Sequence, residues 1–543
     1  MKTALLSAFR KEGLPDFARR LVARGWNLLA SGGTAKCLAE ARIPVTDVAT
    51  IVGPPILGHR VVTLSREIHA ALLAKDTPED AAELTRIGVP RIDLVYVDLY
   101  PLERETLREG STLDSVLEQE DIGGPTMLSS AAKGKRIVIS DPADCGPVLQ
   151  MLESDLPFDT EYREHLAAKA DFIVSRYRML TARFRGNGAF EAIHGILHLP
   201  VAYGENPWLA SLGLFSTQTD YPLALDKYVL MNGEDILPSY NTWGDLDRAQ
   251  LTLLHIMAGL ERNGLLQSNN FCTVGVKHGN ACSVGIGNDS GTSLKRAMEG
   301  DITSIFGGLV IHNGGITAQG AEILLHHVEP SGKRVLDAVA STVFSSDAID
   351  LLRRKTGKCR ILRNPALSAA SLRTLVPSLT SKRIKSVAGG FLPQADRNFV
   401  PCFGDGGGIA IHGSVRPLLH ASTRIADLVL AWAIGSTSTS NTITLVKDGQ
   451  LIANMVGQQS RVRAAKFAVL LAGENGHSTH GAVAYSDSFF PFPDGPKVLI
   501  DAGVKAIFTS SGSIRDQETI DLCLENNVAL FMVPDKVGRG FYH

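Results

Sequence analysis

The chain has 543 residues, with 54 Lys and Arg against 56 Asp and Glu, and a formal net charge of -2. This length is too great for one ordinary hydrophobic core and predicts about two to four domains of roughly 150 residues each. Hydrophobic residues make up 44% and charged residues 20%, which argues against a wholly disordered chain. The near-zero net charge argues against a protein that neutralises a nucleic-acid backbone.

Seven cysteines are scattered through the chain without a CxxC pair. Such an odd, dispersed set fits neither a secreted disulfide framework nor a zinc knuckle, so we expect no metal site and a cytoplasmic protein. Arg10 and Lys11 interrupt the first apolar stretch, which is then too short for a signal peptide. The longest apolar run, near Ala426–Gly435, falls well below the roughly 18–20 residues that span a bilayer, so no membrane partner is expected.

The first 150 residues alternate helix and strand patterns. The amphipathic stretch at 17–25 predicts a helix, and the short apolar run at 26–30 predicts a strand, with the next helix expected after residue 34. Near-continuous apolar runs at 91–100 and 136–140 are typical of parallel strands covered on both faces. This alternation predicts a doubly wound α/β domain over residues 1–150.

A mainly helical bridge is expected over residues 151–197, followed by a larger α/β block over 198–543. Two segments of that block look distantly alike: VGVKHGNACSVGIG and NTITLVKDGQLIANMV each precede a helix and then a further apolar run. This likeness is compatible with a duplicated subdomain, with a boundary near 375–415. The glycine-rich sequence FGDGGG at 403–408 is interpreted as a flexible connector.

The sequence SGGT at 31–34 separates a predicted strand from a predicted helix. Glycines let a backbone approach an anion, and the first amides of a helix point toward it. Thr34 could cap the helix or donate to a phosphate, with Lys11 and Lys36 as cationic partners. A tight βα turn without any ligand is the alternative interpretation.

In DIGGPTM, Asp121 precedes a Gly-Gly-Pro turn, and Lys133 follows further along the chain. The two side chains could share a site at the carboxyl ends of strands, where α/β proteins bind ligands. A helix-capping Asp121 and a solvated Lys133 form the alternative.

The sequence VKHGNACS places Lys277 next to His278. Adjacent residues on a regular strand point to opposite faces, so both can serve one site only where the strand ends or bulges. Such a pair could exchange protons near neutral pH if burial lowers the lysine pKa. The alternative is a packed histidine beside an exposed lysine.

Across nearly the whole chain, a series of ordered motifs resembles the bifunctional AICAR transformylase/IMP cyclohydrolase family. The matching motifs are SGGTAK, IPVTDV, DLYP, DIGGPTM with AAK, YGENP, VKH-N-C, FGG, GQQSR, SD-FFPF-DG and GSIRDQE. The resemblance implies a methylglyoxal-synthase-like α/β domain at the N-terminus, which closes the last ring of IMP. It further implies a C-terminal pair of cytidine-deaminase-like α/β/α subdomains without zinc.

The resemblance also implies a reaction and an assembly. The C-terminal block would move a formyl group from 10-formyltetrahydrofolate to the amino group of AICAR, in a homodimer. Alignment of the two reactants, removal of a proton from the amine and stabilisation of an oxyanion are the tasks of such a site.

Site residues follow from the same resemblance, motif by motif. The implied catalytic residues are Lys277, His278 and Asn441 for formyl transfer, and Tyr100, Asp121 and Lys133 for ring closure. The implied folate contacts are Phe306, Gly307, Asp337, Ser460, Arg461, Phe489, Pro491 and Asp494. The implied substrate contacts are Lys11, Ser31, Gly33, Thr34, Lys36, Arg60, Thr63, Tyr203, Asn206, Asn241 and Arg539.

Departures from the family motifs fall at positions that carry charge in the family. Val62 stands where the family has a lysine, and Ala202 stands where it has an arginine. The family's WKVVKHVKSN is replaced here by WAIGSTSTSN, which lacks the lysines. Loss of one cation from an oxyanion site typically costs about 2–4 kcal/mol, so a weakened cyclohydrolase and an altered acceptor are expected.

Three hypotheses for function follow. The first is folate-dependent formyl transfer to AICAR or a related aminoheterocycle-carboxamide ribotide, with or without cyclisation. The second is formyl transfer to a different, non-phosphorylated amine in a specialised pathway, with a vestigial N-terminal domain. The third is a degenerate paralogue that binds nucleotides or regulates a partner. Retention of Lys277, His278, Asn441 and Asp494 favours the enzymatic hypotheses.

Overall fold

The structure is a computed structural model. It describes residues 2–58, 60–154, 156–210, 212–217, 219–233, 236–329, 332–354, 357–375, 382–395, 399–404, 407–413 and 422–542. The chain divides into two compact units, Met1–His194 and Gly195–His543. Within the parts described, no helix is long and apolar enough to cross a membrane.

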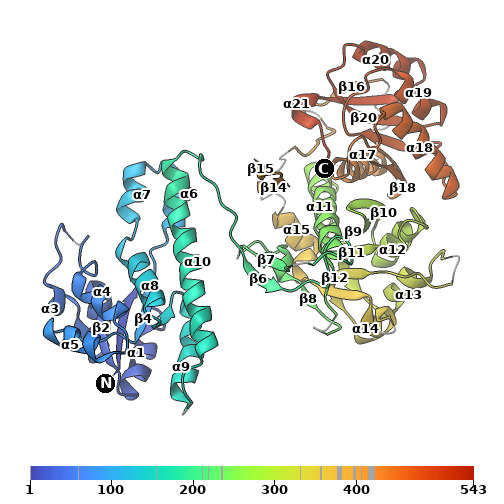
Figure 1. Cartoon of the computed structure of the whole chain (residues 1–543). Coiled ribbons are helices and arrows are strands. Elements are labelled where there is room, and N and C mark those ends of the chain that lie inside the picture. The colour runs from blue at the N-terminus through green and yellow to red at the C-terminus, as the bar shows by residue number, and fades with distance from the viewer. Residues whose placement is uncertain are drawn as a thin grey trace. The chain divides into compact units, whose positions relative to one another are not determined.

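Unit 1 is built on a five-stranded sheet in the order β3-β2-β1-β4-β5, in which every pairing is parallel. Its strands are β1 (Thr3–Ala8), β2 (Asn27–Ala30), β3 (Thr46–Asp47), β4 (Leu94–Asp98) and β5 (Ile137–Ile139). Its helices are α1 (Leu14–Ala23), α2 (Gly32–Glu40), α3 (Ala49–Val52), α4 (Arg66–Leu73), α5 (Pro78–Arg86), α6 (Leu102–Leu107), α7 (Leu113–Gln119), α8 (Gly123–Lys133), α9 (Cys145–Glu153) and α10 (Thr160–Arg185). The predicted doubly wound α/β fold is confirmed (Figure 1).

Two apolar cores lie on opposite faces of this sheet, because neighbouring side chains of a strand point to opposite sides. Leu6 of β1 packs in one core with residues of α1 and α9, and Leu5 packs in the other with residues of α4 and α8. The long helix α10 contributes Leu166 to the first core and Ala170 to the second, and it contacts β5 at the edge of the sheet. Most of the interval 151–197 therefore packs with unit 1.

One boundary in unit 1 differs from the sequence prediction. Helix α2 begins at Gly32, so Gly32, Gly33 and Thr34 form its first turn rather than a separate turn before it. Gly32 has φ of 36°, a conformation that glycine adopts without a steric penalty. Glycine is a poor helix former, and its low propensity hid this helix start in the sequence.

Unit 2 contains a twelve-stranded sheet in the order β16-β21-β20-β19-β17-β18-β10-β9-β11-β12-β13-β8. Its first half comprises β8 (Val229–Leu230), α11 (Tyr240–Arg262), β9 (Phe271–Lys277), β10 (Asn280–Gly287), α12 (Ser290–Glu299), β11 (Leu309–Ile316), α13 (Ala318–His326), β12 (Ala338–Phe344), α14 (Ser346–Leu352) and β13 (Arg360–Arg363). Its second half comprises β16 (Ala410–His412), α17 (Ser422–Ser436), β17 (Ile443–Lys447), β18 (Gln450–Met455), α18 (Arg461–Glu474), β19 (Val483–Ser486), α19 (Asp494–Asp501), β20 (Ala506–Ser511), α20 (Asp516–Glu525) and β21 (Ala529–Pro534).

The two halves repeat one topology element by element. In each half an antiparallel hairpin is followed by three mutually parallel strands, and the strand that starts the half closes the far edge in the antiparallel direction. The halves join where β10 pairs with β18, in register at Gly285 and Gln450. The expected duplication of the C-terminal block is therefore confirmed.

Helices cover both faces of the large sheet. The core on one face includes α11 and α17, which pack against each other, and Trp432 of α17 is 2% exposed there. The cores on the other face include α12 to α14 in the first half and α18 and α19 in the second. The result is an α/β/α arrangement in each half.

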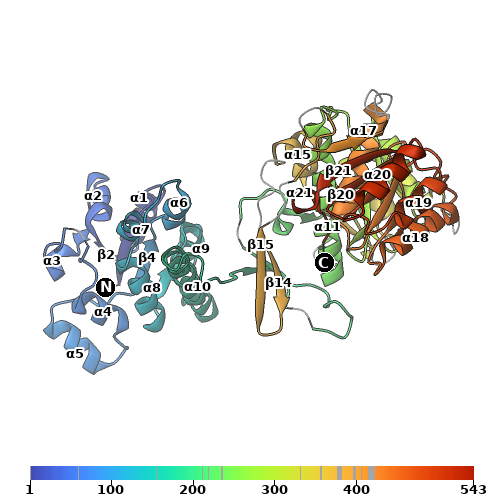
Figure 2. The ribbon, with the colours of Figure 1, turned by 90° about the horizontal axis from the view of Figure 1, so that it is seen from above.

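The remaining elements of unit 2 lie outside the large sheet. They are β6 (Ile196–Leu199), β7 (Leu214–Ser216), α15 (Ala369–Leu375), β14 (Lys382–Val387), β15 (Gly390–Ala395) and α21 (Asp535–Gly538). Figure 2 shows β14 and β15 as a separate two-stranded hairpin. The predicted boundary near 375–415 and the connector at 403–408 fall partly outside the described residues.

The turn of the β17–β18 hairpin is held by a buried carboxyl group. Asp427 of α17 is 2% exposed and accepts hydrogen bonds from the amides of Asp448, at 3.0 Å, and Gly449, at 2.7 Å. Burial raises the pKa of Asp427 to about 6, although the two amides act in the opposite direction.

This pKa predicts a specific dependence of stability on pH. Between about pH 4 and 6, folded Asp427 binds a proton that the unfolded chain has lost, so its contribution to the free energy of unfolding falls as pH rises. Relative to D427N, the wild type should lose up to about 3 kcal/mol between pH 4 and 7. Urea unfolding of both proteins across this range measures the difference. Parallel stability curves would contradict the assignment.

Candidate functional site

The Lys277–His278 pair lies at the turn of the β9–β10 hairpin. His278 has φ of 54° and Gly279 has φ of 71°, the left-handed conformations of a type I′ turn. Strand β9 ends at Lys277, so the pair lies at a strand end and the two side chains are free of strict alternation. His278 is exposed and Lys277 is half-buried, which excludes the alternative of a packed histidine beside an exposed lysine.

The Lys277 ammonium group lies against the loop that precedes β11. Its Nζ donates to the carbonyl oxygen of Phe306 at 2.6 Å. The Gly307 amide donates to Val335 at 2.7 Å, and the Asp337 amide donates to the carbonyl oxygen of Gly308 at 3.0 Å. The structure therefore brings two predicted folate contacts, Phe306 and Gly307, close to the lysine, while Asp337 is joined through its backbone to Gly308, the next residue of the same loop.

The second half of unit 2 closes over the same turn. The side-chain oxygen of Asn280 accepts a hydrogen bond from the Thr439 amide at 2.9 Å. Two residues further on, the Asn441 side chain donates to the carbonyl oxygen of Gln458 at 2.7 Å. Asn441, from the second half, thus lies in the segment that contacts the Lys277–His278 turn.

Arg461 begins helix α18, directly after Ser460. Its guanidinium donates to the Asp487 carboxylate at 2.9 Å and to the Ser486 hydroxyl at 3.2 Å. Asp487 is 1% exposed, and its second carboxylate oxygen has no hydrogen-bond partner among the residues that the structure describes. The predicted Ser460–Arg461 site is therefore anchored to the end of β19 by a buried ion pair.

The C-terminal segment returns to this region. The Gly540 amide donates to the carbonyl oxygen of Asp487 at 3.0 Å, and the Tyr542 amide donates to that of Ser438 at 2.9 Å. Arg539 is exposed and lies 3.5 Å from Asp535. The predicted phosphate-binding arginine therefore belongs to a segment fixed between the loops after α17 and β19.

Phe489, Pro491 and Asp494 follow Asp487 in the loop between β19 and α19. Phe489 is half-buried, while Pro491 and Asp494 are exposed. Asp494 is the first residue of α19, and one of its carboxylate oxygens accepts from the Gly495 amide at 2.8 Å. These three predicted folate contacts thus share one accessible loop.

Tyr203 and Asn206 lie in a loop tied to the start of α11. The Tyr240 amide donates to the carbonyl oxygen of Tyr203 at 3.1 Å, and the Asn241 side chain donates to that of Glu205 at 2.9 Å. Asp245 lies four residues after Asn241, on the same face of α11, and accepts a hydrogen bond from the Gly279 amide at 2.7 Å. This helix therefore connects the predicted substrate loop with the Lys277–His278 turn.

Sequence reasoning did not single out Asp245 or Arg248, which both belong to α11. The Arg248 guanidinium donates to the carbonyl oxygen of Thr437 and lies 4.7 Å from the centre of the Tyr542 ring. Arg383 of β14 lies 3.7 Å from the same ring. Burial lowers the pKa of Arg248 to about 10, and the Arg383 charge acts in the same direction. Two cations thus lie beside the segment that has lost the family lysines.

In unit 1, the Gly turn and its predicted lysine form one cluster at the carboxyl ends of β1 and β2. The Lys11 ammonium donates to the Thr34 hydroxyl at 3.1 Å, and the hydroxyls of Ser7 and Ser31 are 3.1 Å apart. Burial lowers the pKa of Lys11. Gly33 is exposed in the first turn of α2, whereas Lys36 is exposed and lies 4.0 Å from Glu40.

The predicted ring-closure residues are more dispersed. Asp121 directly precedes Ile122, the N-cap residue of α8, and its carboxylate accepts from the Gly124 amide at 3.0 Å, while burial raises its pKa. Lys133 is the last residue of the same helix, so the two lie roughly 15 Å apart along its axis. The structure does not bring Asp121 and Lys133 together within the chain.

Thr63, Arg60 and Tyr100 complete the predicted set in unit 1. Thr63 is 8% exposed, and a Cβ atom on Gly123 would come within 2.6 Å of its hydroxyl oxygen, so it lies against the start of α8. Tyr100 is 48% exposed and its ring centre lies 5.0 Å from that of Phe9. Arg60 is exposed.

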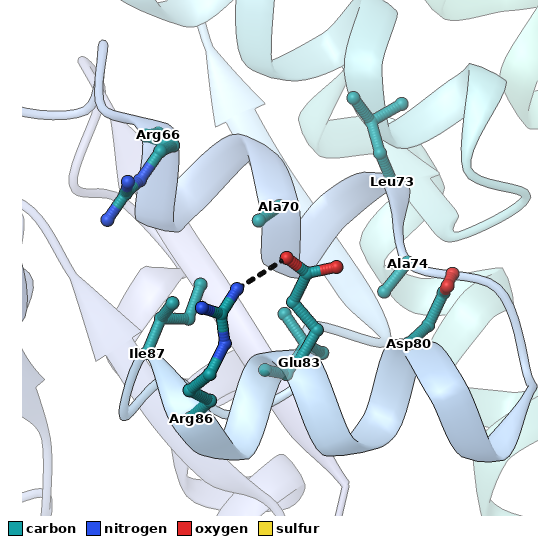
Figure 3. A pocket seen from close by; sticks show the side chains of 9 residues that line it. Arg66, Ala70, Leu73, Ala74, Asp80, Glu83, Arg86 and Ile87 are labelled. Carbon is teal, nitrogen blue, oxygen red and sulfur yellow. Dashed lines mark hydrogen bonds and ion pairs between the residues drawn. The ribbon is translucent and has the colours of Figure 1, made fainter.

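The altered motif at 60–66 leads into a surface hollow of about 280 Å³ between α4 and α5 (Figure 3). Ser65 caps α4 by accepting from the Ile68 amide at 3.1 Å, and Arg66 lies at the rim of the hollow. Arg86 and Glu83 form an ion pair of 2.8 Å in its wall. None of the predicted site residues lines this hollow.

Among the residues that the structure describes, no group of three or more His, Cys, Asp and Glu side chains could hold a metal ion.

Together, the parallel α/β domain and the duplicated α/β/α domain with a Lys–His turn define a two-domain α/β protein. The family model described as "AICARFT/IMPCHase bienzyme" matches residues 131–470, and the model described as "MGS-like domain" matches 13–126. The chain belongs to the AICARFT/IMPCHase family, which indicates an enzyme of formyltransferase type. A solved structure described as "Crystal structure of ForH" is 34% identical, covering 34% of this chain and 99% of that chain, with a TM-score of 0.31.

Proposed function

We propose that the protein transfers a formyl group from 10-formyltetrahydrofolate to the amino group of AICAR or a related aminoheterocycle-carboxamide ribotide. The observation that carries this proposal is the Lys277–His278 turn. It places an ammonium group, fixed on the Phe306 carbonyl oxygen, next to an exposed imidazole. Asn280 of the same turn accepts from the Thr439 amide, two residues before Asn441.

The chemistry follows from these groups. As the amine nitrogen bonds to the formyl carbon, His278 takes up the amine proton, and the proton passes to the folate nitrogen when that C–N bond breaks. The Lys277 ammonium has three N–H groups, of which one donates to Phe306, so it can also donate to the formyl oxygen as negative charge develops there. In this proposal Asn441, whose side chain donates to the carbonyl oxygen of Gln458 at 2.7 Å, orients the acceptor through its amide group.

The loop after β19 offers the chemistry that a folate requires. The folate supplies the formyl group, and the exposed Asp494 carboxylate can accept two hydrogen bonds from the donor edge of a pterin. Phe489 and Pro491 provide apolar surface beside it. Phe306, Gly307, Asp337, Ser460 and Arg461 complete the proposed folate-binding set.

Incubation of the pure protein with 10-formyltetrahydrofolate and AICAR, or related carboxamide ribotides, tests the proposal. Release of tetrahydrofolate and an increase in product mass of one formyl group are the expected results. No release with any of these amines would refute it.

We further propose that the enzyme acts as a homodimer in the cytoplasm. Measurement of its mass in solution by sedimentation tests the dimer, and cell fractionation tests the location.

A second candidate is formyl transfer to an amine without a phosphate group. It is favoured by the neutral side chains at Ala202 and at 436–440, where the family carries cations. Removal of the 5′-phosphate from the acceptor distinguishes the two. An acceptor without phosphate should then react as fast as the ribotide, whereas the first proposal expects a large rise in KM.

For cyclisation of the formylated product, the chain lacks one cation that the family has. Val62 is half-buried against the apolar core that contains α4 and α8, at the position of the family lysine. We expect V62K to raise the rate of ring closure at least about tenfold, because it restores a cation where negative charge develops. V62M is the matched control of similar size without charge. Equal rates for V62K and V62M, measured by product absorbance, would contradict this expectation.

A further inference from the structure

The duplication in unit 2 produces two equivalent hairpin turns, and their sequences align as Lys277-His278-Gly279-Asn280 and Lys447-Asp448-Gly449-Gln450. The left-handed residue has φ of 54° at His278 and 53° at Asp448, and the glycine after it has φ of 71° and 77°. The two turns therefore share one backbone geometry, although the side chain at the left-handed position differs.

Each turn is hydrogen-bonded to an aspartate from the helix that precedes its hairpin. Asp245 is the sixth residue of α11, and Asp427 is the sixth residue of α17. The glycine amide of each turn donates to this aspartate at 2.7 Å in both halves. In the second half the amide of the left-handed residue, Asp448, also donates to the same carboxyl group at 3.0 Å, and in the first half the His278 amide acts on the Asp245 carboxylate and lowers its pKa. Each half therefore has an aspartate that holds its hairpin turn, Asp245 in the first half and Asp427 in the second, and we call this contact the clamp.

The two clamps differ in the charge that faces them. In the second half, the Asp448 carboxylate repels Asp427 and raises its pKa further. In the first half, burial raises the pKa of Asp245 and the charge of His278 lowers it, so carboxylate and imidazolium attract each other. The Asp337 charge also reaches Asp245 and raises its pKa. The aspartate thus faces a side chain that can carry positive charge in the first half and a second carboxylate in the second half.

We propose that Asp245 is a positioning residue for formyl transfer, which fixes the His278 turn and stabilises the imidazolium that forms when His278 takes up the amine proton. This inference rests on the proposed function. Asp245 acts through His278, because its carboxyl group is occupied by the turn amides at the base of the site. Its counterpart Asp427 performs the structural part of the role alone, which makes the second half an internal control.

The pair D245N and D427N separates the two parts of this role. Asparagine keeps one oxygen that accepts a turn amide and replaces the other with an NH2 group, so both variants lose the charge and one acceptor, and the comparison between them isolates what is specific to the His278 turn. With the folate and amine that the wild type uses, D245N should lower kcat about 10- to 100-fold while the KM of both substrates changes less than about threefold. D427N should leave kcat within about twofold. Equal kcat values for the two variants would overturn the proposal, as would a D245N defect confined to KM.

A second measurement does not depend on turnover. Diethyl pyrocarbonate modifies neutral imidazole, and peptide mass mapping follows the reaction of His278 alone. At pH 6, His278 in D245N should react at least about threefold faster than in the wild type, because the negative charge beside the turn is gone. His278 in D427N should react at the wild-type rate. If the wild type shows no turnover, the proposed function fails, while this comparison still tests the contact: unchanged reactivity in D245N overturns it.

Discussion

Replacement of His278 should abolish formyl transfer. We expect H278A to lower kcat about 10²- to 10⁴-fold, the usual contribution of a positioned acid–base group. The imidazole is exposed at the turn and packs in no core, so its loss should leave the fold intact. Tetrahydrofolate release under saturating concentrations of both reactants measures the effect.

Two further variants make this result interpretable. His278 has φ of 54°, a conformation that asparagine tolerates better than alanine, so H278N removes the imidazole with little strain in the turn. H198A removes an exposed histidine from β6 and should keep full activity. Wild-type turnover in both H278A and H278N would exclude His278 as the proton acceptor and favour a protein that only binds nucleotides.

Replacement of Trp432 should have the largest effect on stability. Its side chain is 2% exposed, it packs 5.4 Å from the His255 ring of α11, and a Cβ atom on Gly259 would come within 3.3 Å of it. Truncation of a buried Trp to Ala typically costs about 3–5 kcal/mol through lost burial and the cavity left behind. W432A should therefore lower the free energy of unfolding of unit 2 by about that amount.

Trp208 offers a matched control, because it is 79% exposed. W208A should change the free energy of unfolding by less than about 0.5 kcal/mol. Denaturant unfolding followed by circular dichroism compares the two variants with the wild type. A W432A effect as small as that of W208A would show that the α11–α17 contact contributes little to the stability of unit 2.

The sequence was most informative where apolar runs are long or motifs are local. The run at 91–100 predicted strand β4, and the likeness of the two hairpin segments predicted the duplication of unit 2. The start of α2 was misplaced because Gly32 and Gly33 are weak helix formers, and the helix is stabilised by its packing instead. Local patterns thus predict elements better than their exact ends.

Only part of the candidate site could be predicted from the sequence. The turn geometry that exposes His278 follows from a His-Gly pair between two apolar strands, a signal present in the sequence. Asp245 was missed because it lies more than thirty positions before Gly279, and nothing in the linear pattern links them. Asp121 and Lys133 were paired from motif order, whereas α8 separates them along its whole length. The assignment of substrate and folate contacts stays a prediction.

The pairing of β10 with β18, which joins the two halves of unit 2, determines whether one half could be stable by itself. A single half on its own would present β10 as an open edge and leave the apolar side of α11 uncovered, so it would be stable only by pairing with a twin. Fusion of both halves into one polypeptide makes that pairing independent of concentration. The β9–β10 hairpin can then acquire a functional turn, while the β17–β18 hairpin retains the structural role.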